Sequence, residues 1–343
     1  MRAFFSCHAV RITFVSTVLL ACQSEETEKL KVGLVTDNVV ADNTYNALAV
    51  EGCKKAAAEF KLTFDFIENL VPDTYMKNIG FFGDRKYDHV LTLAFTAGEA
   101  TQAAAEKYPG THFSILDFQY TDYPTSNLNG VAFREDQGGF LAGIIAAQLT
   151  QSKVVGCVGG MEIPAIFRFC NGFAQGVRHA CKECEAITDF AGSFGSTADG
   201  ELSAQRLLDK KVDVIFQAAG LTGSGAILYA AKKGAWVIGV DQDEYFTTFK
   251  GGEEPSAKKL LSSIIKRIDV AAYQTIKRTV DDTFERGSVT FGMKEDAFAA
   301  APFHDAATAV PAGLQAALDD ARKKLADGTL DTGVDPQTGL LKK

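Results

Sequence analysis

The chain has 343 residues, which is enough for two ordinary domains. Hydrophobic residues make up 46 % and charged residues 23 %, which is the composition of a soluble globular protein. The net charge is −8 and no basic cluster carries interleaved aromatic side chains, so nucleic-acid binding is not indicated.

The N-terminus differs from the rest of the chain. Arg2 and Arg11 are the only formal charges before Glu25, and the apolar run 12–21 is too short to span a bilayer. A positive start, a short apolar core and a small residue at its end describe a secretory signal peptide over residues 1–21. The sequence Leu-Leu-Ala before Cys22 resembles the lipobox of bacterial lipoproteins, which implies lipidation of Cys22 and a tether over 22–30. The alternative is a plain signal peptide with an incidental cysteine.

From residue 31 onward, apolar runs alternate with amphipathic stretches. The first series predicts strands at 31–36, 63–67, 88–94, 112–118 and 128–133, with helices at 44–60, from 72 and at 97–107. The apolar stretch 138–149 is predicted to be a buried helix, because it is too short to be a membrane span.

The second series predicts strands at 154–160, 187–190, 212–218, 235–240 and 260–266. Helices are expected at 165–180, 197–209, 226–233, 267–283 and 310–326, with a short extended piece at 289–291. Gly328 is expected to end the last helix, and the tail 331–343 to be frayed. Two such series predict two parallel sheets with helices on both faces, an α/β fold of two Rossmann-like lobes.

The stretch from Asp213 to Asp241 is a strand–helix–strand unit. Its first strand is followed by Gly220, Gly223 and Gly225, which do not fit the dinucleotide pattern and are a weak phosphate signal. The alternative is a tight turn with close packing only. Because ligands bind beyond the carboxyl ends of such strands, Gly220 and Asp241 are expected to face one crevice.

An odd number of cysteines remains once Cys22 and the signal peptide are set aside. The pair Cys181 and Cys184 has the spacing of a redox pair or of half a zinc site, but no second such pair exists. A disulfide between them is favoured, with free thiols and a metal site as alternatives. Cys53 and Cys157 lie in apolar surroundings and are expected to be buried thiols.

A lipobox, two Rossmann-like lobes and no DNA-reading segment resemble a type I periplasmic binding protein. More specifically, the chain resembles the basic membrane protein family, whose members are substrate-binding lipoproteins of ABC importers. The residues that carry the resemblance are Asp42-Asn43-Thr44-Tyr45-Asn46 with Glu51-Gly52, Phe140-Leu141-Ala142-Gly143, Gly172-Phe173 with Gly176, the strand 213–220, Ile238-Gly239-Val240-Asp241 and Ser263-Ile264-Ile265-Lys266-Arg267.

The resemblance implies how the chain is divided. The first lobe would comprise 31–133 plus 245–283, and the second 134–244 plus 284–330. The ligand would lie between the lobes, and hinge closure would trap it.

The resemblance implies a purine nucleoside as ligand, which requires aromatic plates, partners for the base edge and acceptors for the ribose hydroxyls. Carried over by position, the ligand-binding residues would be Asp37, Tyr45, Asn46, Asp117, Met161, Phe194, Gly220, Asp241 and Lys266.

Each of these residues has an implied role. Asp37, Asn46 and Asp117 would read the base edge, with Tyr45 beside Asn46, where the family usually has phenylalanine. Asp241 would accept bonds from the ribose, Lys266 would donate to the sugar or balance Asp241, and amides near Gly220 would close on the ribose. Phe194 would be an aromatic plate, with Met161 nearby.

Structural roles are the alternatives. Asp117 would then cap a loop, Asn46 would bond the helix turn and Lys266 would pair with Asp269. Phe194 would be core packing, and Tyr45 a structural side chain.

The resemblance therefore implies a lipid-anchored binding protein that captures a purine nucleoside and delivers it to an ABC permease in the cell envelope. No cofactor, metal or catalytic residue is implied. The alternatives are another small ligand, such as a sugar or a signalling molecule, and a nucleoside-cleaving enzyme. The histidines show no metal-like spacing, and no GxSxG, HExxH or P-loop is present.

Overall fold

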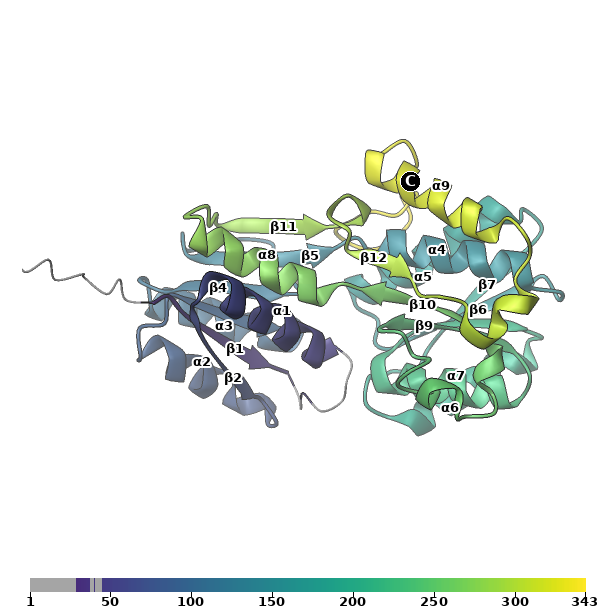
Figure 1. The fold of residues 1–343 in the computed structure, drawn as a ribbon, viewed down its shortest axis with the longest axis horizontal. Coiled ribbons are helices and arrows are strands. Elements are labelled where there is room, and N and C mark those ends of the chain that lie inside the picture. The colour runs from purple at the N-terminus through teal and green to yellow at the C-terminus, as the bar shows by residue number, and fades with distance from the viewer. Residues whose placement is uncertain (1–28, 38–39, 41–44) are drawn as a thin grey trace, which may run out of the picture.

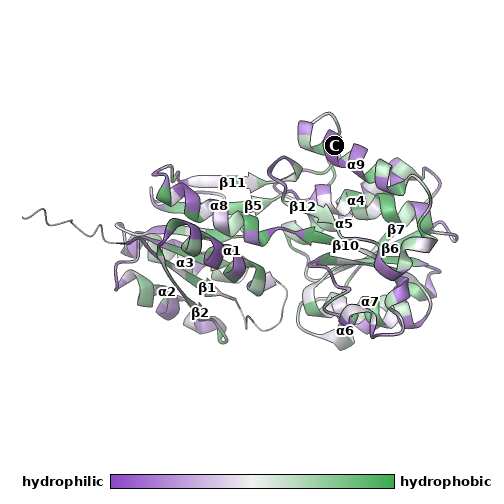
Figure 2. Ribbon diagram, viewed as in Figure 1, coloured by the Kyte–Doolittle hydropathy of each residue, from purple (hydrophilic) through white to green (hydrophobic). Residues whose placement is uncertain are grey.

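The computed structural model describes residues 29–37, 40 and 45–343. Two lobes lie side by side along the long axis of the molecule, and each is built around a six-stranded sheet (Figure 1). Hydrophobic residues concentrate along the central strands, whereas hydrophilic residues mark outer helices such as α9, Leu314–Asp327 (Figure 2). The predicted fold class is confirmed. The predicted signal peptide, residues 1–21, and Cys22 lie outside the described residues.

The first lobe has a wholly parallel sheet with the strand order β11-β5-β4-β3-β1-β2. Its elements are β1 (Lys31–Thr36), α1 (Tyr45–Phe60), β2 (Thr63–Glu68), α2 (Tyr75–Gly83), β3 (His89–Leu93), α3 (Gly98–Lys107), β4 (His112–Leu116), β5 (Leu128–Phe133), α8 (Ile268–Val280) and β11 (Gly287–Phe291).

The second lobe has the order β12-β10-β9-β8-β6-β7, in which β12 is antiparallel and the other strands are parallel. Besides α9 it contains α4 (Glu135–Leu149), β6 (Val154–Gly159), α5 (Pro164–Ala180), β7 (Glu185–Phe190), α6 (Thr197–Asp209), β8 (Val214–Ala218), α7 (Gly220–Lys232), β9 (Trp236–Asp241), β10 (Leu260–Lys266) and β12 (Phe298–Ala300).

The predicted division into lobes is wrong at two places. Residues 245–266 were expected in the first lobe, but β10 pairs in parallel with β9 and extends the second sheet. Residues 287–291 were expected in the second lobe, but β11 pairs with β5 in the first. The reason is that each apolar strand pairs with the sheet of the lobe that the chain already occupies: β10 follows β9 in the second lobe, and β11 follows α8 in the first. The chain therefore changes lobe at 267 and 292.

The glycines after β8 belong to a helix. Helix α7 begins at Gly220, not at residue 226 as predicted. A Cβ at Gly223 would lie 1.8 Å from Oε1 of Gln217, and one at Gly225 would lie 2.6 Å from the carbonyl oxygen of Thr197 at the start of α6. These glycines therefore serve close packing, which was the alternative to a phosphate loop.

Helices α4 and α5 also touch through glycines. Cβ atoms at these glycines would lie within 2.1–2.2 Å of a carbonyl oxygen of the facing helix. The glycines are Gly139 and Gly143 on α4 and Gly172 and Gly176 on α5. Three of them belong to the motifs that carry the family resemblance, and this contact gives those motifs a packing role.

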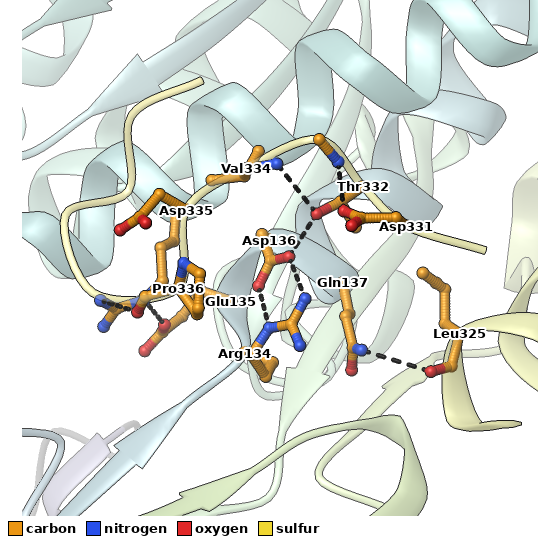
Figure 3. A network of polar contacts seen from close by, with 12 residues as sticks. Arg134, Glu135, Asp136, Gln137, Leu325, Asp331, Thr332, Val334, Asp335 and Pro336 are labelled. Carbon is orange, nitrogen blue, oxygen red and sulfur yellow. Dashed lines mark hydrogen bonds and ion pairs between the residues drawn. The ribbon is translucent and has the colours of Figure 1, made fainter. Parts of the chain in front are cut away.

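The C-terminal tail is ordered and packed, so the prediction that it is frayed is wrong. Val334 forms an antiparallel bridge with Leu341, and Val334 and Thr332 are buried. Thr332 donates a hydrogen bond to Asp136 in the first turn of α4 (Figure 3). These contacts hold the tail against the second lobe.

Candidate functional site

The predicted site residues lie at the carboxyl ends of strands. Asp37 follows β1 and Asp117 follows β4 in the first lobe, and Asp241 and Lys266 are the last residues of β9 and β10 in the second. Because neighbouring strands in each set are parallel, these ends share one edge of their sheet. The two edges meet where Nζ of Lys266 donates to Oδ1 of Asp117 at 2.6 Å.

The first turn of α1 adds two side chains. The buried hydroxyl of Tyr45 faces the carboxylates of Asp37, Asp117 and Asp241, without a hydrogen bond of good geometry in the described part of the chain. Burial and then these carboxylates raise the pKa of Tyr45 well above its usual value. Oδ1 of Asn46 accepts from the backbone N–H of Asp37 at 3.4 Å.

The other predicted residues lie along the same edge of the second sheet. Met161 comes after β6 and is half exposed, and Phe194 comes after β7. The ring of Phe194 lies against Gly160, where a Cβ would come within 2.3 Å of it. Gly220 has φ +53° and opens α7, beside the carbonyl oxygen of Phe194. In the strand order, Lys266, Asp241, Gly220, Met161 and Phe194 follow one another along this edge.

Two charged residues of the site were missed by sequence reasoning. Oε1 of Glu135 accepts from Nζ of Lys266 at 2.9 Å, and its other oxygen accepts from Nε of Arg168. Lys266 and Glu135 are almost completely buried, with side chains 3 % and 0 % exposed. For Glu135, the available signal was its place shortly before the strongly apolar stretch 138–149. A carboxylate there indicates the start of a helix, and the sequence alone does not indicate a role in the site.

The pKa values follow from burial and neighbouring charges. Burial alone would raise the pKa of Glu135, but Arg168 and Lys266 outweigh it and lower that pKa to about 2. Burial raises the pKa of Asp117 despite Lys266. Burial also raises the pKa of Asp241 to about 7; Lys266 works against this rise and neighbouring carboxylates add to it.

The site is therefore rich in hydrogen-bond acceptors. When these five groups are ionised, the three carboxylates Asp117, Glu135 and Asp241 exceed the two cations, Lys266 and Arg168, by one negative charge. Such a site favours ligands that donate hydrogen bonds, such as hydroxyl or amino groups.

The backbone at two of the aspartates is unusual. Asp117 has φ +63° and Asp241 has φ +66°, in the left-handed region that few residues other than glycine adopt. Aspartate tolerates this region better than most residues. Backbone strain of this kind concentrates at functional sites, and here it occurs at two of the predicted site residues.

A second buried carboxylate supports the strand end that carries Asp241. Glu244 accepts hydrogen bonds from Gln217 at 2.5 Å, from Ser224 at 3.0 Å and from the backbone N–H of Val240 at 3.3 Å. It joins β8, α7 and β9 and so fixes the turn after Asp241. The sequence offered no signal for this role.

The cysteines differ in part from prediction. Cys181 and Cys184 form the favoured disulfide. Cys157 was expected to be a free buried thiol, but it is bonded to Cys170, because β6 and α5 bring their Cα atoms to 5.7 Å. Cys53 is a buried free thiol as predicted, and burial raises its pKa.

The two lobes, each built around a mostly parallel sheet, have the fold of ABC transporter solute-binding proteins of known structure. A structure of an ABC transporter solute-binding protein from Aeropyrum pernix K1 has this fold, with TM-score 0.73 and 24 % identity over 88 % of this chain and 92 % of that one. A family model described as "ABC transporter substrate-binding protein PnrA-like" (Bmp) matches residues 29–302. The chain belongs to this Bmp family, and the predicted resemblance is confirmed.

Two curated relatives support the assignment. Basic membrane protein A of Borreliella burgdorferi is 30 % identical over 83 % of this chain and 84 % of its own length. The ABC transporter nucleoside-binding protein BmpA of Lactococcus lactis is 29 % identical over 81 % of this chain and 85 % of its own. The chain is therefore an ABC transporter substrate-binding protein. Proteins of this family are extracytoplasmic substrate-binding proteins.

Proposed function

We propose that the protein binds a purine nucleoside between its lobes and delivers it to an ABC permease. The observation that carries the proposal is the meeting of Asp117 and Lys266 across the lobes, with Asp241 and Tyr45 beside them. An acceptor-rich site matches the donors of a nucleoside, namely ribose hydroxyls and base N–H groups. A relative whose name describes it as nucleoside-binding adds support.

The roles of the site residues belong to the same proposal. Asp37, Asn46 and Asp117 read the base edge, while Asp241 accepts from the ribose and Lys266 donates to it or balances the carboxylates. Phe194 is an aromatic plate, with Met161 beside it, Tyr45 lies against the base and the backbone at Gly220 closes on the ribose.

Isothermal titration with adenosine, guanosine, inosine, cytidine, uridine and ribose tests the proposal, after refolding has removed carried-over ligand. We expect sub-micromolar binding of purine nucleosides, lost in Asp241→Ala. Binding of ribose alone, or of no member of the panel, would reject the nucleoside and point to another small ligand. Steady release of free base from inosine would instead show an enzyme.

We also propose that the mature chain begins at a lipidated Cys22 and is held at a membrane by its lipid chains. The lipobox-like sequence before Cys22 supports this proposal. Separately, no helix within the described residues is long and apolar enough to cross a bilayer. Mass spectrometry of the membrane fraction is the test. An N-terminal peptide that begins at an unmodified residue other than Cys22 would refute lipidation.

A further inference from the structure

The C-terminal tail, residues 331–341, makes specific contacts that the proposed binding function does not use. The family model ends at residue 302, so the tail lies outside it. Besides the Thr332 contact with α4, Asn171 on α5 donates to the carbonyl oxygen of Gly339 at 2.6 Å. Figure 3 shows the tail folded over the first turn of α4.

The tail also completes the surroundings of Arg168. The guanidinium of Arg168 is buried, and its Nε donates to Glu135. Its Nη1 donates to the backbone carbonyl oxygens of Pro336 at 3.2 Å and Gln337 at 3.4 Å. These carbonyls accept bonds from the part of the guanidinium that Glu135 does not reach, and they cover it from solvent.

Arg168 is connected to the site through Glu135. One oxygen of Glu135 accepts from Arg168 and the other accepts from Lys266, which also contacts Asp117 in the first lobe. A continuous series of hydrogen bonds and ion pairs therefore runs from the tail carbonyls to the place where the lobes meet. Because Glu135 is shared between two cations, a displaced Arg168 would leave Lys266 as its remaining charge partner and draw the ammonium away from Asp117.

We infer that Arg168 is a positioning residue of the ligand site. The C-terminal tail holds Arg168, and Arg168 fixes the position of Lys266 through Glu135 without touching the ligand. The inference, which rests on the proposed function, predicts that the tail sets ligand affinity from outside the site. The glycines of the tail offer a matched pair of variants to test it in the full chain.

Gly339 and Gly333 both have left-handed backbones, with φ +77° and +74°. A Cβ at Gly339 would lie 2.5 Å from the carbonyl oxygen of Pro164 and 2.7 Å from the backbone nitrogen of Arg168, so Gly339→Ala pushes the tail off α5. At Gly333 the nearest atoms are those of Gln175 at 3.9 Å, so Gly333→Ala carries the same backbone strain without the clash.

The first readout is affinity for the purine nucleoside that the full chain binds most tightly, followed from pH 5.5 to 9. We expect Gly339→Ala to weaken binding at least about tenfold and to raise the pH midpoint of binding, because Asp117 and Asp241 lose part of their compensating cation. Gly333→Ala is expected to behave as the unsubstituted chain. Equal effects of the two variants, or a weaker affinity with an unchanged midpoint, would overturn the inference.

A second readout needs no ligand and separates this inference from the proposed function. Carboxyl ¹³C resonances of labelled aspartate report the titration of Asp241 in the unliganded protein, where the facing groups are Lys266, Asp117, Glu135, Glu244 and Tyr45. We expect a higher midpoint in Gly339→Ala and in Arg168→Met, with partial recovery in Arg168→Lys. An unchanged midpoint in folded Arg168→Met would overturn the inference, whether or not nucleosides bind.

Discussion

At the scale of single residues, the site depends on a few buried charges whose neighbours decide their state. Lys266 is compensated by Asp117 and Glu135, and its pKa is raised because these partners, with Asp241, outweigh the effect of burial. Among the described residues, no cation forms an ion pair with Asp241, and its pKa of about 7 follows mainly from burial. The site is therefore sensitive both to pH and to the loss of a single charge.

The pH dependence of binding has a definite sign. Hydroxyl donors require the ionised form of Asp241, which is lost as the pH falls through about 7. We expect nucleoside affinity to be highest above pH 8 and to fall, in the limit about tenfold per pH unit, below 7. Titration calorimetry across this range checks the slope. Asp241→Asn should bind weakly with a flat pH profile, and tighter binding by the unsubstituted protein at pH 5.5 would contradict the proposed role.

Removal of the lysine should destabilise the fold. Lys266→Met leaves Asp117 and Glu135 without their shared ammonium in a buried site, and we expect a loss of about 3–5 kcal/mol in the free energy of unfolding at pH 8. The cost should shrink at pH 5, where the carboxylates take up protons more readily.

Urea unfolding monitored by circular dichroism measures this loss. The matched control is Lys277→Met, which removes an exposed lysine paired with Asp281 and should cost less than about 1 kcal/mol. Equal effects of the two substitutions would mean that the buried contacts of Lys266 are not stabilising.

At the scale of elements, close helix contacts position the strand ends. Helices α4 and α5 meet through glycines, and α4 presents Glu135 while α5 presents Arg168 to it. The disulfide between Cys157 and Cys170 joins β6 to α5 close to Arg168 along the helix. The glycines therefore set the distance between the two helices that carry this ion pair.

A single methyl group tests this packing. In Gly143→Ala the new Cβ would lie 2.2 Å from the carbonyl oxygen of Phe173, and helix separation should cost about 1–3 kcal/mol. Thermal unfolding measures the change. Gly110→Ala, where no atom lies within 4 Å, is the control and should change stability by less than about 0.5 kcal/mol. A stabilised Gly143→Ala would show that the helices can move apart freely.

At the scale of the whole molecule, the chain changes lobe between β5 and α4, between β10 and α8, and between β11 and β12. Connections of this kind permit hinge motion, and the Asp117–Lys266 contact joins side chains of the two lobes. We expect the purine nucleoside to favour the approached state, because its partners lie on both lobes.

Small-angle X-ray scattering tests the hinge. The radius of gyration should fall on addition of the ligand, and the ligand-free Asp117→Asn variant should have a larger radius than the unsubstituted protein, since the contact across the lobes is weakened. An identical radius in all three samples would indicate a rigid molecule.

Most of the fold could be predicted from the sequence. Periodic apolar runs identify strands and helices locally, and the predicted helix 197–209 coincides with α6. The predicted site residues could also be selected from the sequence. They follow apolar strands, and the carboxyl ends of parallel strands gather at one edge of a sheet. Asp37, Asp117, Asp241 and Lys266 all follow this rule.

Other features depend on contacts between distant parts of the chain. Which sheet receives β10 and β11 is decided by strand pairing, which local patterns do not encode. The tail lies on α5 because its carbonyls accept hydrogen bonds from Arg168, about half the chain away.

The sequence by itself determined the fold class, the family and the residue types at the strand ends, because these depend on local periodicity and on sequence motifs. Only the tertiary structure decided the partners of each charge. Glu135 lies at a helix start in the sequence, but in the structure it is buried and pairs with both Arg168 and Lys266. Burial and proximity arise only when the lobes assemble, and they set the pKa values of Glu135, Asp117 and Asp241.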